Sequence, residues 1–364
     1  MGRDALKVAI RTLFRFPVHS LITLSGLAAG LACCLLISLY VVDELSYDRY
    51  NLDADNICRI ATEHRVSDRR VGDALTPGPL ASAVAGEFPE VLAAVRFWKD
   101  PGRESVVVGT GLRSGSEKRF YFCDPSVFRV FTFPLVRGEP DRCLREPFTV
   151  VLSESAARRY FGTIDPVGRR LSVNLGEPRE YRVTGVMQDI PRSSHLRADF
   201  LASLSSLEEM QGHLFIDWQR ADFYTYILLS REYSPDALSG SLRDLIGKYM
   251  GPESYNRVGF FLQPLTSIHL RSHLESEAEP NGDIATVTAF SAIALFVLLI
   301  ACINFMNLAT ARSSARAREV AVRKILGARR GGLILQFMGE SVFTALLALL
   351  FACSLVEMAL PAFN

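Results

Sequence analysis

The sequence lacks the short motifs that mark most hydrolases and nucleotide-binding enzymes. It contains no G-x-x-x-x-G-K-[ST] phosphate loop, no H-E-x-x-H zinc motif and no G-x-S-x-G nucleophile turn. No cysteine lies beside a residue that could act as its base. We therefore expect no catalytic residue, no metal site and no directly bound cofactor in this chain.

An excess of charge of one sign is also missing. The 364 residues carry 40 Lys and Arg against 39 Asp and Glu, which gives a formal net charge of +1. Such a balance shows no basic excess that would indicate a nucleic-acid partner, and we expect none. The charges are instead unevenly distributed along the chain.

Three stretches have almost no charge. Residues 18–42 and 284–311 contain no Asp, Glu, Lys or Arg. In residues 341–360, Glu357 is the single charged residue. A helix of about 25 residues rises roughly 37 Å, which exceeds the roughly 30 Å hydrocarbon core of a bilayer. We predict transmembrane helices at 18–42, 284–311 and 335–360. A cleaved signal peptide is the alternative for the first stretch, but its apolar region would span only about 7–15 residues.

Basic residues flank these stretches unequally. Four of them, against the single acid Asp4, precede the first stretch: Arg3, Lys7, Arg11 and Arg15. Seven, against the single acid Glu319, separate the second stretch from the third: Arg312, Arg316, Arg318, Arg323, Lys324, Arg329 and Arg330. Because basic loops stay in the cytoplasm, we place residues 1–17 and 312–334 there and residues 43–283 and 361–364 outside. Buried helices of a large soluble protein would not explain this agreement.

Residues 43–283 have the mixed pattern of an α+β domain. β-branched and aromatic residues predict strands at 148–152, 180–187, 223–229 and 258–262. Ser153 as N-cap and Gly162 as stop signal enclose one predicted helix. A second, at 237–250, carries an apolar face of Leu238, Leu242, Leu245 and Ile246. Residues 189–217 are less regular. The predicted fold class is a membrane protein with three transmembrane α-helices and a large α+β extracytoplasmic domain between the first two.

Two groups of polar residues could be taken for sites in this domain. His269 and His273 are four apart, a spacing that could place two metal ligands on one helical face, but residues 264–270 look extended and no third ligand is evident. Asp43, Glu44 and Asp48 could form a general acid/base set. We expect these three carboxylates instead to face solvent where the first helix leaves the membrane.

The cysteines of the same segment are odd in number. Cys58, Cys123 and Cys143 fall in the part predicted to lie outside the cytoplasm, where thiols can oxidise. At most one disulfide can form among the three, and the spacing does not select a pair.

A few residues stand out inside the predicted membrane helices. Gly26 and Gly30 form a G-x-x-x-G spacing, which predicts a close helix–helix contact in a dimer or within a bundle. Glu340 and Glu357 lie near the ends of the third apolar stretch, where exposure to the interface costs little. We therefore interpret both carboxylates as a consequence of their place near the ends of the stretch, and not as functional groups.

The basic loop and its surroundings carry a specific pattern. Residues 315–340 read A-R-x-R-E-V-A-V-R-K-I-L-G-A-x-R-x-x-L-I-x-Q-F-x-x-E, which resembles the loop of MacB/FtsX-type ABC transporter permeases. LITLSGLAAGLACCLLISLYVVDELSYDRY resembles the first helix of the larger members. FTVVLSESAARRYFGTIDPVGRRL and YRVTGVMQDIPRSSHLRADFLAS resemble their MacB-like periplasmic core, with its porter- and sabre-like parts. LQPLTSIHL and FSAIALFVLLIACINFMNLATARSS resemble the approach to and body of their second helix.

This resemblance implies a partner and a mechanism. In the family, a separate or fused ATPase docks on a coupling helix in this loop, and its ATP-driven closure moves the membrane helices and the periplasmic domain. The implied partners are an ABC ATPase subunit, a second permease in a homo- or heterodimer, the lipid bilayer, and a periplasmic adaptor or cargo. The residues that carry over to ATPase coupling are Glu319, Val322, Arg323, Lys324, Ile325, Leu326, Gly327 and Ala328.

The chain departs from the family pattern at two points. It has no phosphate loop, so ATP is expected to act through a partner subunit rather than on this chain. The family has four helices per unit, so a fourth helix is expected to be missing and the chain to be a permease subunit or an N-terminal fragment of one. We expect it in the cytoplasmic (inner) membrane. The alternative is a membrane-anchored extracytoplasmic ligand-binding receptor or signalling protein.

Overall fold

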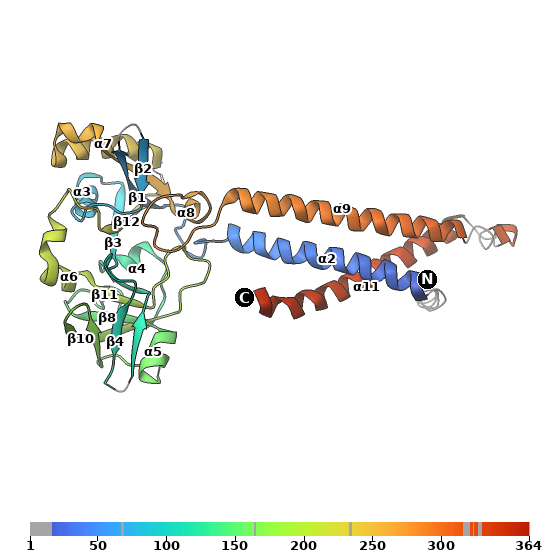
Figure 1. Cartoon of the computed structure of the whole chain (residues 1–364), viewed down its shortest axis with the longest axis horizontal. Helices are drawn as coiled ribbons and strands as arrows, with labels where there is room; N and C mark the ends of the chain where they lie inside the picture. Colours follow the sequence, from blue (N-terminus) through green and yellow to red (C-terminus); the bar gives the residue numbers. More distant parts are fainter. Residues whose placement is uncertain are drawn as a thin grey trace. The chain divides into compact units, whose positions relative to one another are not determined.

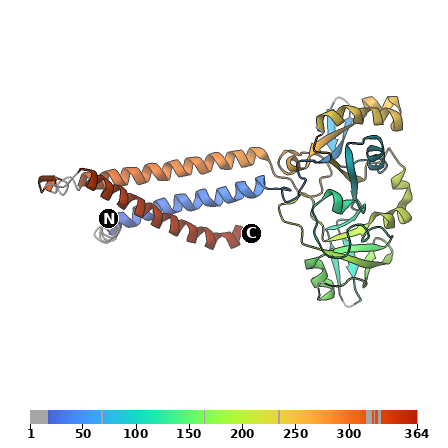
Figure 2. The ribbon, with the colours of Figure 1, turned by 180° about the vertical axis from the view of Figure 1, so that it is seen from behind.

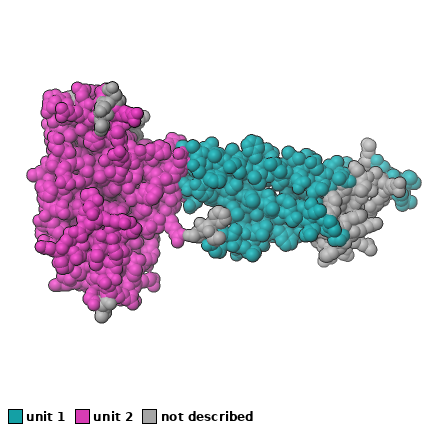
Figure 3. Space-filling view, viewed as in Figure 1, with its two compact units in different colours: residues 1–45, 284–364 teal, residues 46–283 magenta. Residues whose placement is uncertain are grey.

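The computed structural model describes residues 17–66, 69–111, 113–163, 165–232, 235–315, 321–322, 324–326 and 330–363. The chain divides into two compact units (Figures 1 and 3). The membrane unit combines residues 1–45 with residues 284–364, and the second unit, here called the domain, comprises residues 46–283.

Three long helices form the membrane unit: α2 Pro17–Leu45, α9 Ile284–Ala315 and α11 Arg330–Phe363. In the described part of the chain, three stretches are long and apolar enough to cross a membrane, Ser20–Leu45, Ile284–Ala311 and Gly331–Pro361, with mean hydropathies of 2.2, 2.6 and 2.2. α2 and α9 run side by side, and α11 crosses α2 (Figures 1 and 2). α2 therefore contacts both other helices.

Small residues bring these helices together. Ala28, Ala301 and Ala348, one from each helix, are buried in a single cluster with Leu27. Ala32 and Ala352 form a second cluster between α2 and α11. Close approach of small side chains supplies the packing that the hydrophobic effect cannot provide inside a bilayer.

One mixed sheet runs through the domain (Figure 1). Its order is β13-β1-β12-β3-β6-β11-β8-β10-β9-β4-β5, with β2 paired to β1 and β7 to β10. β6 is parallel to β11 and β8 to β10, and the other pairs are antiparallel. The strands are β1 Ile57–Val66, β2 Arg69–Asp73, β3 Val91–Trp98, β4 Val106–Gly109, β5 Ser114–Glu117, β6 Phe120–Cys123, β7 Leu135–Arg137, β8 Thr149–Ser153, β9 Arg170–Asn174, β10 Pro178–Met187, β11 Phe200–Ser203, β12 Phe223–Leu229 and β13 Val258–Pro264.

Short helices cover both faces of the sheet. They are α3 Leu80–Glu87, α4 Val127–Val130, α5 Glu154–Phe161, α6 Leu204–Gln211, α7 Pro235–Met250, α8 Leu265–Arg271 and the 3₁₀ helices η1 Gly212–Phe215 and η2 Pro252–Asn256. Two further segments join the domain to the membrane helices along the chain. We call residues 46–56, between α2 and β1, the first connector, and residues 272–283, between α8 and α9, the second connector.

The two faces of β1 and β12 are buried under different elements. Ile57 and Tyr226 point to the face covered by α4, α8 and the first connector. Cys58 and Ile227 point to the opposite face, covered by α3 and α7. Successive side chains of a strand alternate between faces, so both strands contribute to two separate parts of the core.

The helix and strand signals that were strongest in the sequence are confirmed. Ser153 caps α5, because its hydroxyl accepts a hydrogen bond from the backbone N–H of Ala156, and Gly162 ends that helix with a φ of 69°. The four predicted apolar residues of α7 are all buried. The predicted strand 223–229 has the same bounds as β12. Part of the irregular stretch 189–217 is regular after all, as β11, α6 and η1.

The expectation that residues 264–270 are extended is wrong. Leu265–Arg271 form the helix α8, which begins after the extended residue Pro264. Leu265 and Ile268, three residues apart, both pack into the core, and this spacing suits one face of a helix. The run was too short for its periodicity to distinguish a helix from a strand.

The three cysteines of the domain are buried free thiols. Burial raises the pKa of Cys58 to about 12 and that of Cys143 to about 11, and it also raises the pKa of Cys123. A thiol reacts as its thiolate, so these side chains act here as small apolar packing residues.

Candidate functional site

The predicted coupling segment is partly described. Glu319, Arg323, Gly327 and Ala328 lie outside the described residues, whereas Val322, Lys324, Ile325 and Leu326 lie within them. The N–H of Leu326 donates to the carbonyl of Val322 at 3.0 Å, which closes one helical turn. Val322, Ile325 and Leu326 are 56%, 85% and 80% exposed. This turn therefore presents three bare apolar side chains beside the exposed Lys324.

The predicted packing glycines lie against α9 of the same chain. A Cβ added to Gly30 would stand 2.5 Å from the Cβ of Ala301, and one added to Gly26 would stand 3.3 Å from the side-chain amide nitrogen of Asn304. Contacts below 3.0 Å do not occur between real Cβ atoms. Only glycine at position 30 allows α2 and α9 their present separation.

Glu340 is buried, which corrects our interpretation of it as an exposed residue near the end of a stretch. α11 begins at Arg330, so Glu340 lies about 15 Å inside the helix at 1.5 Å per residue. The side chain of Gln336, one turn earlier, donates to Glu340 Oε1 at 3.4 Å. Glu357 is exposed in the described structure, near the other end of α11.

Asp48, in the first connector, is also buried, which corrects the expectation that it faces solvent. It is 1% exposed. Its Oδ1 accepts hydrogen bonds from the hydroxyl of Ser194 at 3.0 Å and from the N–H of His195 at 3.2 Å, and its Oδ2 lies 2.8 Å from His195 Nδ1. The backbone at Asp48 has a φ of 60°. Sequence reasoning placed Asp48 with Asp43 and Glu44, but α2 ends at Leu45 and only those two belong to the helix.

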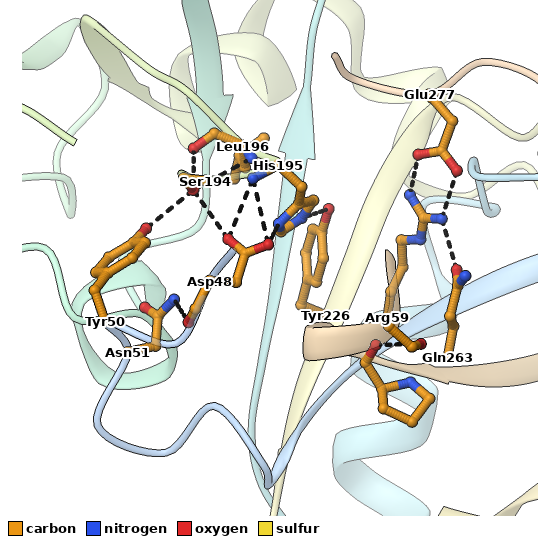
Figure 4. Close-up of polar contacts among 12 residues, drawn as sticks. Asp48, Tyr50, Asn51, Arg59, Ser194, His195, Leu196, Tyr226, Gln263 and Glu277 are labelled. Carbon is orange, nitrogen blue, oxygen red and sulfur yellow. Dashed lines mark hydrogen bonds and ion pairs between the residues drawn. The ribbon is translucent and has the colours of Figure 1, made fainter. Parts of the chain in front are cut away.

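His195 links Asp48 to a strand of the sheet. Its Nε2 lies 2.8 Å from the hydroxyl of Tyr226, in β12 (Figure 4). Burial raises the pKa of Tyr226, so the phenol keeps its proton. When the Tyr226 O–H donates to Nε2, the hydrogen of the imidazole lies on Nδ1 and is donated to Asp48.

A second buried cluster holds the second connector. Arg59, in β1, donates through Nη1 to Glu277 Oε2 at 2.6 Å and through Nη2 to Glu277 Oε1 at 2.8 Å. Nη2 also donates to Gln263 Oε1 at 2.6 Å and to Ser272 Oγ at 2.9 Å. Burial acts to raise the pKa of Glu277, but the hydrogen bond and charge of Arg59 outweigh it and hold that pKa below its usual value.

The two clusters meet on one face of the sheet. Arg59 and Tyr226 are direct cross-strand partners in the β1–β12 pair. Figure 4 shows two hydrogen-bonded groups, one from Asp48 through His195 to Tyr226 and one from Arg59 to Glu277, and the cross-strand pairing of Tyr226 with Arg59 sets the two groups next to each other. We call these five residues the buried polar chain. Four of them, Asp48, His195, Tyr226 and Arg59, are at most 3% exposed.

The sequence did not predict this arrangement, although it contains one signal for it. Arg59 interrupts the apolar run Ile57, Cys58, Ile60 and Ala61. An arginine in a strand that is otherwise apolar must find a buried partner, but nothing in the sequence indicates that the partner is Glu277. Among the described residues, no group of three or more His, Cys, Asp or Glu residues could hold a metal ion.

Comparisons with known proteins agree with the resemblance noted in the sequence. Residues 20–245 match the MacB-like periplasmic core domain, and residues 291–364 match the FtsX-like permease C-terminal region. The chain is 26% identical over 239 residues to the macrolide export ATP-binding/permease protein MacB of Chlorobium luteolum, across 64% of this chain and 32% of that protein. It is 24% identical over 205 residues to the uncharacterized ABC transporter permease YknZ of Bacillus subtilis, across 54% of this chain and 45% of that protein.

The match to these relatives spans less than half of their length. Among solved structures, a domain of a proposed permease protein from Porphyromonas gingivalis is similar, with a TM-score of 0.50 and 24% identity over 59% of this chain and 92% of that one. This likeness supports the fold.

Proposed function

This chain belongs to the MacB/FtsX-type ABC transporter permeases, and from that premise we propose that it relays the motion of a separate ATPase to its domain outside the membrane. The observation that carries the proposal is the exposed apolar turn of Val322, Ile325 and Leu326 between two membrane helices. Large apolar side chains this exposed are typical of a surface that a partner covers.

The proposed orientation follows from charge. Basic residues before α2 and between α9 and α11 favour the cytoplasm for residues 1–17 and 312–334. The domain, connected to the opposite ends of α2 and α9, would then lie in the periplasm or outside, and the membrane would be the cytoplasmic (inner) one. On this arrangement the exposed turn faces the compartment that contains ATP.

In the proposed docking surface, apolar and charged residues have different tasks. Val322, Ile325 and Leu326 would enter an apolar groove of the ATPase, as helix-in-groove contacts do. Arg323, Lys324 and Glu319 would set orientation and partner choice through charge, and Gly327 with Ala328 would let the chain turn toward α11. ATP binds to the partner, and this chain binds no cofactor itself.

The packing of the helices supports a path for the motion. α11 follows the coupling segment directly and packs against α2, and α2 packs against α9. A push on the segment would therefore reach both helices that continue into the domain. We propose that the motion serves export, extraction or mechanical signalling to an extracytoplasmic cargo or adaptor, with a second permease completing a dimer.

The test is association with an ATPase in membranes. Full-length chain with Leu326→Asp should lose a co-purifying phosphate-loop ATPase and its ATP turnover, because a carboxylate would be buried in an apolar contact. Ile216→Asp is the matched control, since Ile216 is 78% exposed in the domain. If Leu326→Asp retained the ATPase as well as Ile216→Asp does, the proposed docking surface would be contradicted. Ligand binding by the domain without any ATPase partner would favour the receptor alternative.

A further inference from the structure

We propose that the buried polar chain is a joint that fastens both connectors to the same two strands, so that α2 and α9 act on the domain as a single lever. The inference rests on the proposed function for its purpose, but the joint itself is a property of the domain. It assigns positioning roles to Asp48, His195, Tyr226, Arg59 and Glu277, through which movement of either connector reaches β1 and β12.

The first connector is fastened close to the end of its helix. Asp48 stands three residues after Leu45, so at most about 10 Å of extended chain separates them. The N–H of Asp48 donates to the carbonyl of Ser193 at 2.8 Å. The side chain of Asn51 accepts from the N–H of Thr132 at 2.9 Å. Together with the carboxylate bonds, these contacts leave the connector little freedom to move independently of the domain.

The second connector is fastened by a matching set of contacts. Glu277 binds Arg59, and the neighbouring carbonyl of Ser276 accepts from the hydroxyl of Tyr224 at 2.8 Å. The N–H of Glu275 donates to the carbonyl of Gly72 at 2.9 Å. Tyr224 belongs to β12, as does Tyr226, so both connectors bind residues of one strand.

Backbone strain occurs at both fastening points. Among the described residues, Asp48, Phe148 and Ser276 are the non-glycine residues with positive φ, and the first and last lie in the two connectors at 60° and 56°. Such conformations are unfavourable for residues with a side chain and persist where the surroundings impose them. Their position indicates that the connectors are held in these paths by side-chain contacts.

The directionality of hydrogen bonds explains why the joint is built from polar residues. A buried ion pair is costly to desolvate, and apolar side chains of similar volume often stabilise a fold equally well. Hydrogen bonds differ from apolar packing because they are directional, and a pair such as Arg59–Glu277 allows one geometry. A connector held by apolar contacts alone could slide under load, whereas this one is fixed in register.

The Arg96–Asp124 pair is a matched control elsewhere in the domain. Arg96 donates through Nε to Asp124 Oδ2 at 2.9 Å and through Nη2 to Asp124 Oδ1 at 2.9 Å. Both side chains are largely buried. Arg96 lies in β3 and Asp124 just after β6, and neither belongs to a connector. Breaking this pair removes a comparable contact without touching the joint.

The experiment is hydrogen–deuterium exchange on the full-length chain in lipid nanodiscs without nucleotide or ATPase. Asp48→Asn should speed exchange about tenfold or more in the first connector, and it should also speed exchange several-fold at Glu275 in the second. Glu277→Gln should have the reciprocal effect on Asp48. Asp124→Asn should leave both connectors within twofold of the wild type. The effect across the domain is the readout, because a merely local structural role would not produce it.

Tyr226→Phe tests the middle of the joint. It removes one hydroxyl and keeps the ring, so the domain should fold, and in this background Asp48→Asn and Glu277→Gln should no longer affect each other's connector. The proposal is overturned if either single variant changes only its own connector, or if the cross-effect survives Tyr226→Phe. It is also overturned if Asp124→Asn produces the same cross-effect. Because no ATPase is present, failure here leaves the docking proposal to its own test.

Discussion

The membrane unit and the domain hold their polar interiors in different ways. In the membrane unit, hydroxyls bond within their own helix: Thr344 donates to the Glu340 carbonyl at 2.9 Å and Ser291 to the Val287 carbonyl at 2.8 Å. In the domain, Asp48 and Arg59 bind partners 147 and 218 residues away in sequence. The polar groups of the membrane unit named here are satisfied locally, whereas those of the domain join segments that are far apart in the sequence.

The largest expected effect comes from breaking the domain's interior. Arg59→Met removes a guanidinium that is fully buried and leaves Glu277 without the cation that pairs with it, so we expect a loss of about 3–5 kcal/mol in the free energy of unfolding. Urea unfolding followed by tryptophan fluorescence measures it, because both tryptophans of the chain, Trp98 and Trp218, lie in the domain.

The control for this variant is an exposed ion pair between β1 and the neighbouring strand β2. Glu63 of β1 binds Arg70 at 3.1 Å, but the arginine side chain is 72% exposed. Arg70→Ala should therefore cost less than about 1 kcal/mol. A similar loss in the two variants would show that burial does not set the difference between these ion pairs.

A smaller effect is expected from the close contact in the membrane unit. Gly30→Ala places a methyl group 2.5 Å from the Ala301 side chain and should destabilise the pairing of α2 with α9 by about 1–3 kcal/mol. Thermal unfolding in detergent measures the loss. The double variant Gly30→Ala with Ala301→Gly should recover most of it, because the space is exchanged between the two helices. Without such recovery, the contact is not what limits this pairing.

The smallest effect is a pH dependence of the domain. The folded pKa of Glu277 is lowered, so its contribution to stability is present above the usual carboxyl value of 4.5 and is lost as pH falls through the lower folded value. The slope from one such group is at most about 1.4 kcal/mol per pH unit. Glu277→Gln should flatten the acid limb of a stability curve measured below pH 4.5, and an unchanged limb would assign it to other carboxylates.

Local signals made much of the fold predictable. The helix between Ser153 and Gly162 carried its own cap and stop, and α7 carried its apolar face in its spacing. The short helix α8 was predicted as extended, because seven residues are too few to establish a period and its burial depends on the sheet beneath it.

The candidate site was predictable in its membrane part and hidden in the domain. The coupling residues follow one another in a single loop, so a resemblance could find them together, and their contact with an ATPase stays a prediction. Asp48 and Glu340 were both misjudged because their place in the sequence suggested exposure near the end of a helix. Residues 194–195 cover Asp48, and α11 begins at Arg330, so Glu340 lies well inside that helix and not near its end.

The sequence by itself determined the three apolar helices, the basic loop between the last two and the α+β character of what lies between the first two. These properties depend on composition and spacing over short ranges, where hydrophobicity and charge act residue by residue. Only the tertiary structure decided that Asp48 and Glu277 reach one pair of strands. The Asp48–His195 and Arg59–Glu277 contacts join residues 147 and 218 positions apart, and the antiparallel pairing of β1 with β12 brings Arg59 opposite Tyr226.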